Sequence, residues 1–476
     1  MSEAVTRPGI TTDALLASLD PLLRGWLPRQ RWFAGKGRPI TGFHLVTATE
    51  LLPPTARSGL LHLLVRVDQP RIPGQGGGAA GAQPADCYQL LLGVRRELPP
   101  RLAPALIGHV TAGPLAGFTV YEALYDPRMA EFLMEALRMR AHVGKLRFER
   151  DMRKDIGEGL VPRVLAAEQS NSSLVYGDTY ILKLFRRIVP GLNPDLELPL
   201  MLAREGCAQV PAPAAWFLAD LPDDVNVLGV LQPYLKGTTD GWDRALRELA
   251  EGEDFKSEAQ ALGRATADVH LALARALPTV TLGRAQVELI AEGMAERLEA
   301  AAGAVPALLP YAKALHTAFD AFADLAADGT LWTAQRIHGD LHLGQFLRSP
   351  SGDWSLIDFE GEPSRPLAER RLPQPAVRDV AGMLRSFDYA ARSAEPWSPR
   401  WAGECRAAYC TGYAEVSGRD PRTDPVALRA YETDKAVYEV LYEARHRPDW
   451  MPVPLAAVHR LAMNGPASNG PATEAP

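Results

Sequence analysis

The apolar residues of this chain change their spacing near its middle. Short apolar runs with the alternation of β-strands occupy much of residues 43–94 and 163–235. After Gly241 the chain instead carries long Ala- and Leu-rich blocks at helical spacing, over residues 256–277, 284–302 and 306–327. A chain that is mostly strand first and mostly helix afterwards predicts an α+β protein of two lobes with a cleft between them.

The length of 476 residues exceeds what one hydrophobic core usually supports, so we expect several packed units. The patterns divide the chain into a small α+β unit over residues 1–105, a strand-rich part over 106–235 and a helical part over 236–462. Residues 463–476 are rich in Gly, Pro, Ala, Ser and Asn, which predicts a disordered tail.

Shorter segments predict local structure in the same way. The Gly-, Pro- and Ala-rich residues 70–86 predict a flexible surface loop, and the charged residues 129–155 predict one long helix. A Gly177-Asp178 turn inside residues 173–185 predicts a β-hairpin. A helix with proline in its first turn is expected at 194–204, and a strand at 227–235.

The net charge of −6 gives the chain as a whole no attraction to nucleic acid or to an anionic membrane. The sequence has no run of about 18 apolar residues, and its first residues lack the apolar core of a signal peptide. The four cysteines, Cys87, Cys207, Cys405 and Cys410, form no C-x-x-C pair and no zinc pattern with histidines. These observations predict a cytoplasmic protein with reduced thiols and with neither nucleic acid nor membrane as partner.

A short polar loop in the helical half carries the residues that phosphoryl transfer needs. His338-Gly339-Asp340 opens this loop, Gln345 lies five residues after Asp340, and a short strand delivers Asp358 eighteen residues after it. Asp340 suits the carboxylate that orients an acceptor hydroxyl and takes its proton, while Gln345 and Asp358 suit ligands of the Mg²⁺ that accompanies ATP. The competing interpretation is a pair of ordinary loop carboxylates with capping histidines. The occurrence of His-Gly-Asp, Gln345 and Asp358 in this order and spacing favours a catalytic role instead.

The strand-rich half offers candidate nucleotide contacts. A turn of small polar residues, Ser170, Asn171, Ser172 and Ser173, precedes the strand that bears Lys183. Backbone N–H groups and hydroxyls of such a turn can hold phosphates, although an ordinary hairpin turn has the same composition. Lys183 fits the lysine that grips the α- and β-phosphates of ATP and pairs with a carboxylate on the next helix, for which we expect Glu197, with Glu205 as the alternative.

These motifs resemble a known family. The His-Gly-Asp-x-His-x-x-Gln loop followed by Ile-Asp-Phe-Glu resembles the aminoglycoside phosphotransferase branch of the protein-kinase-like superfamily. Longer phrases resemble the actinobacterial maltokinases: Pro-Arg-Gln-Arg-Trp-Phe-Ala-Gly-Lys at 28–36, Glu-Gln-Ser-Asn-Ser-Ser at 168–173, Asp-Phe-Glu-Gly-Glu-Pro at 358–363 and residues 378–387. With the helix at 431–443, the resemblance covers about residues 28–455.

The resemblance implies a bilobal kinase whose residues 1–105 are an N-terminal cap, 106–235 the N-lobe and 236–462 the helical C-lobe. It implies ATP-dependent conversion of maltose to maltose 1-phosphate for α-glucan and glycogen synthesis, and partners among the enzymes of a trehalose-to-glucan pathway. It also implies a hinge at 231–235 whose backbone, at Gln232 and Tyr234, meets the adenine edge, while the residues alone fit a plain linker equally well. The cations and aromatic residues at 28–36, which alone suggest nucleic-acid stacking, are then an interdomain joint.

The acceptor side is expected along one face of a C-terminal helix. Lys435, Tyr438, Glu439 and Tyr442 fall at i, i+3, i+4 and i+7, and charges interleaved with aromatic rings suit a sugar. The candidate acceptor contacts are His338, His342, Glu360, Lys435, Glu439 and Tyr442. Arg378 and Asp379 either line the same cleft or form a structural ion pair.

Two alternatives remain at the sequence level. An amino sugar such as glucosamine would use the same fold, with its ammonium near Glu439 and Glu443, although Lys435 disfavours it. A pseudokinase that only binds would typically have lost Lys183, Asp340 or Asp358, and all three residues are present.

Overall fold

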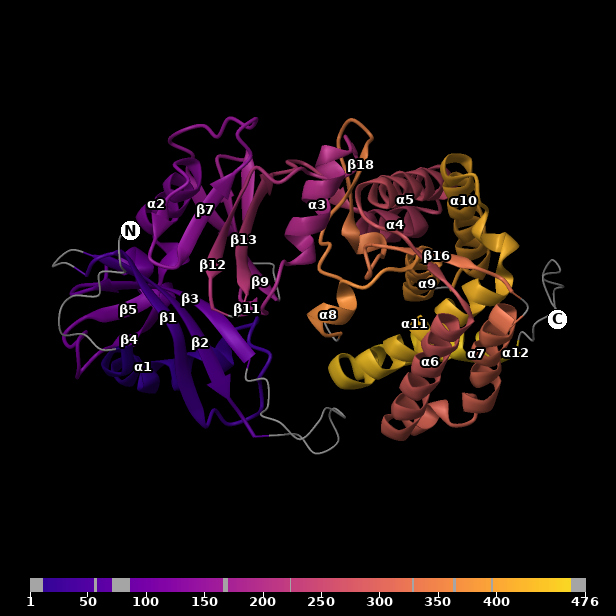
Figure 1. Cartoon of the computed structure of the whole chain (residues 1–476), viewed down its shortest axis with the longest axis horizontal. Helices are drawn as coiled ribbons and strands as arrows, with labels where there is room; N and C mark the ends of the chain where they lie inside the picture. Colours follow the sequence, from indigo (N-terminus) through magenta and orange to yellow (C-terminus); the bar gives the residue numbers. More distant parts are fainter. Residues whose placement is uncertain are drawn as a thin grey trace. The chain divides into compact units, whose positions relative to one another are not determined.

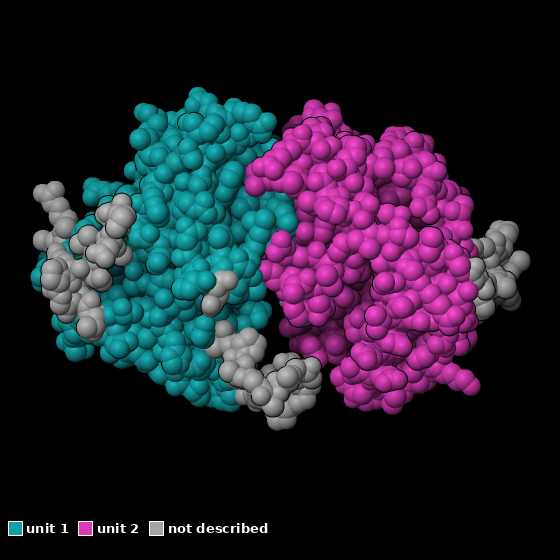
Figure 2. All heavy atoms as spheres, viewed as in Figure 1, with its two compact units in different colours: residues 1–197, 212–236 teal, residues 198–211, 237–476 magenta. Residues whose placement is uncertain are grey.

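A computed structural model describes residues 12–54, 58–70, 86–165, 170–222, 224–327, 329–362, 365–394 and 397–463. The chain forms two compact units, Met1–Glu197 with Ala212–Lys236 (unit 1) and Leu198–Pro211 with Gly237–Pro476 (unit 2), which Figure 2 colours separately. Strands fill unit 1 and helices dominate unit 2 (Figure 1), which agrees with the predicted α+β class. Among the described residues, no helix combines the length and the apolar composition needed to cross a bilayer.

The first sheet of unit 1 is antiparallel and has the order β1-β2-β3-β5-β4. Its strands are β1 (Gly42–Leu52), β2 (Gly59–Asp68), β3 (Asp86–Arg95), β4 (Leu106–His109) and β5 (Thr119–Glu122), with helix α1 (Thr12–Trp26) alongside. Alternate residues of β2, from Leu61 to Val67, share one buried cluster with Leu19 and Leu23 of α1, as a period of two requires. The strand-like runs predicted within residues 43–94 correspond to β1, β2 and β3, and the sheet continues past residue 105, where we expected the first unit to end.

The second sheet of unit 1 has the order β6-β7-β12-β13-β10-β9-β8. Its strands are β6 (His142–Val143), β7 (Leu146–Arg150), β8 (Pro162–Leu165), β9 (Asn171–Tyr176), β10 (Tyr180–Phe185), β12 (Ala215–Asp220) and β13 (Val225–Pro233). The predicted hairpin is β9–β10, and its turn residues Gly177 and Asp178 both have positive φ, 54° and 51°, as a tight hairpin of this twist requires.

The long helix predicted at residues 129–155 is wrong. Helix α2 ends at Arg138 (Pro127–Arg138), and the chain then turns into the hairpin β6–β7 through Gly144, whose φ is 60°. Leu146 and Phe148 alternate inward, and the Phe148 ring stacks on Phe217 at 5.2 Å. The many charges of this segment concealed a period-two pattern, so composition outweighed spacing in the sequence analysis.

One buried polar joint connects the two sheets of unit 1. Gln89 of β3 donates from Nε2 to the carbonyl oxygens of Phe185 (2.8 Å) and Leu228 (2.9 Å), and its Oε1 lies 2.9 Å from His62 Nε2. Arg186, which follows Phe185 in the chain, forms a buried ion pair with Glu122 at 3.0 Å. Strand β11 (Arg187–Ile188) then pairs with β3, so the first sheet is bonded to the chain of the second.

The expected joint at residues 28–36 contacts this region, because the Arg186 guanidinium lies 4.9 Å from the centre of the Trp32 ring. The expected loop at residues 70–86 lies outside the described residues for all but its two ends, and so do residues 464–476 of the expected tail.

Unit 2 is built mainly of helices. They are the end of α3 (Pro194–Arg204), α4 (Gly241–Glu251), α5 (Lys256–Ala276), α6 (Arg284–Ala304), α7 (Ala312–Ala327), α8 (Leu367–Arg370), α9 (Val377–Ser393), α10 (Pro399–Ser417), α11 (Pro425–His446) and α12 (Pro452–Met463). Two small sheets join them, β14 (Thr239–Asp240) with β17 (Phe346–Arg348) and β18 (Trp354–Leu356), and β15 (Val280–Leu282) with β16 (Trp332–Gln335) and β19 (Gln374–Pro375). The three helical blocks predicted from the sequence correspond to α5, α6 and α7.

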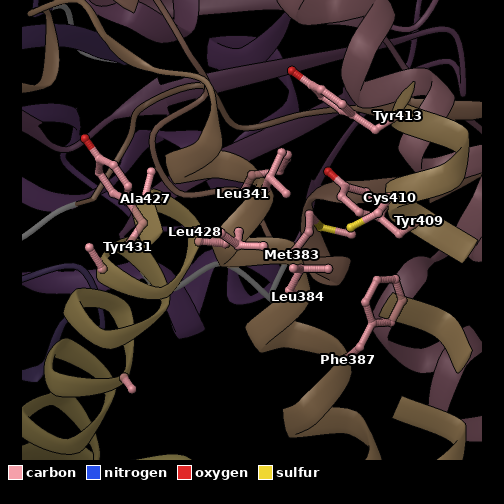
Figure 3. Close-up of a cluster of buried hydrophobic side chains, with 14 of the residues drawn as sticks. Leu341, Met383, Leu384, Phe387, Tyr409, Cys410, Tyr413, Ala427, Leu428 and Tyr431 are labelled. Atoms are coloured by element: carbon pink, nitrogen blue, oxygen red, sulfur yellow. The ribbon is translucent and has the colours of Figure 1, made fainter. Parts of the chain in front are cut away.

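Glycines let the core helices of unit 2 approach backbone to backbone. A Cβ on Gly263 of α5 would lie 2.1 Å from the Tyr409 carbonyl oxygen, and one on Gly412 of α10 would lie 1.9 Å from that of Gln260. Figure 3 shows the core beside this crossing, where Met383 and Phe387 of α9 gather near Tyr409 together with Leu341 from a loop. Leu341 lies one residue after Asp340, so the predicted catalytic loop is anchored in the core.

The buried His62 generates a prediction about pH. Burial lowers its pKa from 6.5 to about 4, and the described chain offers its Nδ1 no hydrogen-bond partner. Because the unfolded chain binds the proton more tightly, the neutral ring stabilises the fold above pH 6.5, and this contribution is lost as the pH falls toward 4. The loss corresponds to roughly 3 kcal/mol.

We therefore expect His62→Gln, which still donates to Gln89, to flatten the fall in unfolding free energy between pH 6.5 and pH 4 in urea titrations. His142→Gln, which removes an exposed imidazole on β6 of unit 1, serves as the control and should leave the slope unchanged. Superimposable pH profiles for wild type and His62→Gln would contradict the prediction.

Candidate active site

The loop that contains Asp340 is held by a buried carboxylate on helix α9. Asp379 accepts hydrogen bonds from the backbone N–H groups of His338 (2.8 Å) and Gly339 (2.9 Å) and lies 3.0 Å from His270 Nε2. Burial alone would raise the pKa of Asp379, but the hydrogen bonds from His270 and Gly339 outweigh it and lower the pKa. Asp379 therefore stays ionised and fixes the backbone that presents Asp340.

Arg378, the neighbour of Asp379, has a different partner. Its Nη2 lies 3.0 Å from Glu362 Oε2, so the two adjacent residues do not form the ion pair that the sequence left open. His338 is 2% exposed, and its Nε2 lies 2.9 Å from the Ile357 carbonyl oxygen. This contact ties the loop to the segment that carries Asp358, and it favours a positioning role for His338 over the acceptor contact that we predicted.

Lys435 from helix α11 sits between two carboxylates. Its Nζ lies 2.9 Å from Asp340 Oδ1 and 3.2 Å from Glu362 Oε1. Burial would lower the pKa of Lys435, but the charges of Asp340 and Glu362 raise it. Within the described chain the other oxygen of Asp340, Oδ2, accepts no hydrogen bond, so it is the atom available to an incoming hydroxyl.

The surroundings of Glu362 keep it ionised. Burial would raise the pKa of Glu362, but Lys435, Arg378 and Arg365 lower it to about 2. Arg365 Nε lies 2.8 Å from Glu362 Oε2, so both oxygens of this carboxylate are occupied by cations. Glu362 thus orients Lys435, which in turn fixes Asp340.

The predicted metal ligands lie together at the end of β18. Gln345 Nε2 is 3.3 Å from Asp358 Oδ2, and a carboxylate oxygen of Glu360 lies within 4.8 Å of one of Asp358. Asp358 has a φ of 66°, an unusual conformation for a residue other than glycine and one that often marks a functional position. Carboxylate and amide oxygens are the ligands that Mg²⁺ prefers, so this donor set fits the ion once the Gln345 amide turns its oxygen inward.

A cavity of about 500 Å³ opens beside Asp340. Its walls come from the start of α4, the catalytic loop, α9, α11 and the 3₁₀ turn Pro448–Trp450: Asp240, Trp242, Asp243, Asp340, His342, Gly344, Gly382, Ser386, Tyr389, Lys435, Tyr438, Glu439, Tyr442, Arg447 and Trp450. Four of the predicted acceptor residues line it, namely His342, Lys435, Glu439 and Tyr442. Carboxylates for hydroxyl groups and aromatic rings for a C–H face are both present, so the cavity suits a polar ring compound.

The lining residues of this cavity differ in whether another residue of the chain already binds them. Glu439 Oε2 receives Arg385 Nη2 at 2.6 Å, whereas the Tyr442 ring is 37% exposed and lies 6.2 Å from the Tyr438 ring. Burial lowers the pKa of His342, which keeps the ring neutral beside Gln345. Sequence reasoning missed Asp240, Trp242, Asp243, Tyr389 and Trp450, which lie in three separate stretches of the chain.

In unit 1, Lys183 lies on β10 opposite Ser173 of β9, as the sequence suggested. Its Nζ forms an ion pair with Asp195 Oδ2 at 2.8 Å, so the structure supplies Asp195, which we did not select. Glu197, the residue we expected, lies in the first turn of the same helix α3. The signal in the sequence was Asn193-Pro194-Asp195, in which the Asn193 side chain accepts a hydrogen bond from the Asp195 N–H at 2.9 Å and starts the helix.

The turn expected at Ser170–Ser173 is a strand for most of its length, because Asn171 to Ser173 begin β9 and pair with β10. Ser172 Oγ receives a hydrogen bond from Arg186 Nε at 2.8 Å, and Asn171 Nδ2 lies 3.4 Å from Ser170 Oγ. Residues 168 and 169 of the motif lie outside the described residues. Tyr234 N donates to Thr179 O at 2.8 Å and follows Gln232 near the end of β13, and the chain passes from unit 1 to unit 2 after Lys236.

Comparison with known protein families divides the chain into two matches. Residues 26–126 match the model of the maltokinase N-terminal cap domain, and residues 161–419 match that of the phosphotransferase enzyme family. The first match agrees with the maltokinase resemblance of the sequence, and the second covers more than half of the chain.

Two curated relatives are glucosamine kinases. The protein from Streptacidiphilus jiangxiensis is 32% identical over 322 residues, which are 61% of this chain and 71% of that protein. The protein from Mycolicibacterium smegmatis is 29% identical over 328 residues, which are 64% of this chain and 80% of that protein.

Solved structures of glucosamine kinase have a similar fold. One, in complex with glucosamine, ADP and inorganic phosphate, matches with a TM-score of 0.64 at 24% identity and covers 93% of this chain and 98% of that one. A second, crystal form B, has a TM-score of 0.67, again at 24% identity, with the same coverage. These similarities confirm the predicted kinase-like fold with an N-terminal cap domain.

The role of Asp379 generates a testable prediction. Asp379→Ala leaves two backbone N–H groups and His270 without their buried acceptor, so we expect the unfolding free energy to fall by about 3–5 kcal/mol. Asp254→Ala removes a mostly exposed carboxylate from the same unit and should cost less than about 1 kcal/mol. Urea unfolding followed by fluorescence measures both values. A cost for Asp379→Ala no greater than for Asp254→Ala would contradict the assignment.

Proposed function

We propose that the chain, which belongs to the phosphotransferase enzyme family, transfers the γ-phosphoryl group of ATP to the anomeric hydroxyl of maltose and forms maltose 1-phosphate. The observation that carries the proposal is the cavity beside Asp340, which five aromatic side chains and three further carboxylates line together with the free Asp340 oxygen. The maltokinase-type cap over residues 26–126 adds support.

Family membership confirms the broader expectations. The chain is an ATP-dependent kinase with a hydroxyl acceptor, and it binds a nucleotide and a small-molecule substrate. The identity of the acceptor, the use of Mg²⁺, a cytoplasmic location, glycogen biosynthesis and a place among trehalose-to-glucan enzymes remain proposals. The pseudokinase alternative has no feature in its favour, since Lys183, Asp340 and Asp358 are all present.

In the proposed reaction Asp340 Oδ2 accepts a hydrogen bond from the anomeric hydroxyl. As the hydroxyl oxygen bonds to the γ-phosphorus, its proton passes to Asp340, and the bond from phosphorus to the bridging oxygen of ADP breaks. Lys435 holds Asp340 Oδ1 at 2.9 Å and prevents the carboxylate from rotating away. Such orientation of reacting groups is worth up to roughly 7–11 kcal/mol.

The remaining predicted residues have supporting roles. In unit 1, Lys183 would bind the α- and β-phosphates, with Asp195 holding the ammonium group in place. The segment from Ser170 to Ser173, at the start of β9, would contact the phosphates through its polar side chains. In unit 2, Asp358 and Gln345 would hold Mg²⁺, which when bound neutralises charge on the phosphates.

The aromatic side chains favour an acceptor of two sugar rings. Tyr438 and Tyr442 lie one helical turn apart with ring centres at 6.2 Å, and Arg447 continues the row to Trp450 at 5.2 Å from its ring. The row follows α11 from Lys435, the residue that binds Asp340, and its successive aromatic faces offer more than one stacking position. A disaccharide would place its reducing ring at Asp340 and its second ring against the outer aromatic residues.

Glucosamine is the second candidate, and Asp240 and Asp243 favour it. Neither carboxylate forms an ion pair with a cation of the described chain, and burial together with the charge of Asp243 raises the pKa of Asp240. An ammonium group would stabilise both. The sites that we expected for it are already taken, because Glu439 binds Arg385 at 2.6 Å and Glu443 binds Arg447 at 2.6 Å. The curated relatives named above are glucosamine kinases.

Asp340→Asn tests the assignment of the base. The amide cannot take the proton, so we expect kcat to fall by about 10²–10⁴-fold while the affinity for ATP stays near the wild-type value. Asp353→Asn, in the exposed turn between β17 and β18, should retain full activity. A coupled ADP assay gives kcat, and titration calorimetry gives ATP affinity. More than about a tenth of the wild-type kcat in Asp340→Asn would exclude it as the general base.

A panel of sugars with ATP and Mg²⁺ decides between the acceptors, with phosphorus NMR locating the phosphate. We expect kcat/KM for maltose to exceed that for glucosamine, and Tyr442→Ala to lower the maltose value by about 2–10-fold. If glucosamine is the acceptor, Asp240→Asn should instead lower the glucosamine value by about 10–100-fold. Phosphorylation of glucosamine but not of maltose would overturn the first proposal and leave the kinase assignment intact.

A further inference from the structure

Unit 2 contains a second cavity, of about 430 Å³, that shares no lining residue with the acceptor cavity. Helices α7, α9, α10, α11 and α12 surround it, with Arg422 from the turn Pro421–Thr423. Three of its wall residues, Leu384 of α9, Cys410 of α10 and Leu428 of α11, are labelled in Figure 3. The proposed kinase reaction makes no use of this cavity.

The charged groups of this cavity are unbalanced. Four arginines line it, Arg406, Arg422, Arg429 and Arg460, against a single carboxylate, Glu432. Three of them are paired: Arg406 with Glu432 and Asp388, Arg460 with Asp388, and Arg422 with Asp420. In the part of the chain that the structure describes, Arg429 forms no ion pair with any carboxylate.

Arg429 is a half-buried cation with no anionic partner in the described chain. Its Nη2 donates to the Leu461 carbonyl oxygen at 2.9 Å, and its Nε is buried without a partner in the described chain. Burial lowers the pKa of Arg429, and no neighbouring carboxylate raises it again. A guanidinium group in this position binds phosphate or carboxylate oxygens well, because its N–H groups match their geometry.

The cavity also has apolar lining residues. Ala318 and Ala321 of α7 and Val426 and Leu428 of α11 also line the cavity, so a ligand with a small carbon body would bury apolar surface there while its anionic group meets Arg429. A phosphate monoester on a compact carbon skeleton suits both kinds of lining residue.

A chain of buried ion pairs leads from this cavity to the acceptor site. Asp388, which receives Arg406 Nη1 at 3.2 Å and also binds Arg460, lies 3.0 Å from Arg385 Nη1. Arg385 is 1% exposed and holds Glu439, a lining residue of the acceptor cavity, at 2.6 Å. Arg385 donates Nη1 to Asp388 and Nε and Nη2 to Glu439, so a change in the charge around Asp388 acts on the same guanidinium group that holds Glu439.

We propose that the cavity around Arg429 binds a phosphate monoester, and that its binding weakens acceptor affinity through Asp388, Arg385 and Glu439. The ligand's phosphate group pairs with Arg429 and competes with Asp388 for Arg406 and Arg460. The site is distinct from the phosphotransfer centre, so it is an effector site. Its existence does not depend on which sugar is the acceptor.

The binding test uses the full chain with glucose 1-phosphate and inorganic phosphate as probes, measured by titration calorimetry with saturating ADP to fill the nucleotide site. We expect Arg429→Gln, which keeps a donor for the Leu461 carbonyl, to weaken glucose 1-phosphate binding at least about tenfold. Arg429→Lys should retain part of the affinity. Arg445→Gln removes an exposed cation from the same helix α11 and should bind as wild type.

The two probes separate recognition of the phosphate group from recognition of the carbon body attached to it. Tighter binding of glucose 1-phosphate than of inorganic phosphate supports a contribution of the apolar lining residues, and equal affinities place recognition in the phosphate group alone; both results support the site. Unchanged affinity in Arg429→Gln, with an unchanged melting temperature, would overturn it. An equal loss in Arg445→Gln would also overturn it, because the effect would then follow net charge.

Steady-state kinetics test the coupling. Glucose 1-phosphate should raise the acceptor KM several-fold with little change in kcat, and Arg429→Gln should abolish that rise while its KM without the probe stays normal. Potassium chloride at matched ionic strength is the control. An acceptor KM that does not respond while calorimetry shows binding would overturn the coupling, whereas a failure of the acceptor assignment alone would leave the binding result untouched.

Discussion

A buried carboxylate without water must find its hydrogen-bond donors in the protein, and Asp379 finds them in the catalytic loop. It accepts the N–H groups of His338 and Gly339, at 2.8 and 2.9 Å, and meets His270 from α5 at 3.0 Å. Helix α9 holds the same loop at two further points. The Ser386 hydroxyl accepts the Leu343 N–H at 3.0 Å, and Gly382 leaves only enough room for the Leu341 carbonyl. The position of Asp340 is therefore a consequence of α9.

Helix α9 also organises the charges on either side of it. Lys435 of α11 binds Asp340 of the catalytic loop, and Arg385 of α9 binds Glu439 of α11, so two ion pairs align the walls of the acceptor cavity. Asp388, one turn after Arg385, gathers arginines from α10 and α12 at the second cavity. Removing one partner from a buried pair leaves an uncompensated charge, so these contacts are coupled to one another. One helix thus connects the chemistry of the loop with a cavity that takes no part in it.

In unit 1, buried polar side chains also connect neighbouring elements, and fewer residues are involved. Gln89 bonds the first sheet to the Phe185 and Leu228 carbonyls, and Arg186 connects Trp32, Glu122 and Ser172. The maltokinase-type cap is therefore bonded to the start of β9, which we propose as a phosphate contact. Arg186 contacts both the cap and Ser172, so a shift of its guanidinium group would move Ser172. The cap thus has a physical role in positioning the start of β9.

The sequence by itself determined the strand-to-helix order, the hairpin that carries Lys183, and the local series from His338 to Asp358, because period and turn chemistry act over a few neighbouring residues. It misjudged residues 129–155, where charge masked the alternation of Leu146 and Phe148. Only the tertiary structure decided that Lys183 pairs with Asp195, that Lys435 binds Asp340 across 95 positions, and that Asp240, Tyr389 and Trp450 meet in one cavity. Those contacts join segments whose separation along the chain carries no information about distance, so packing alone brings them together.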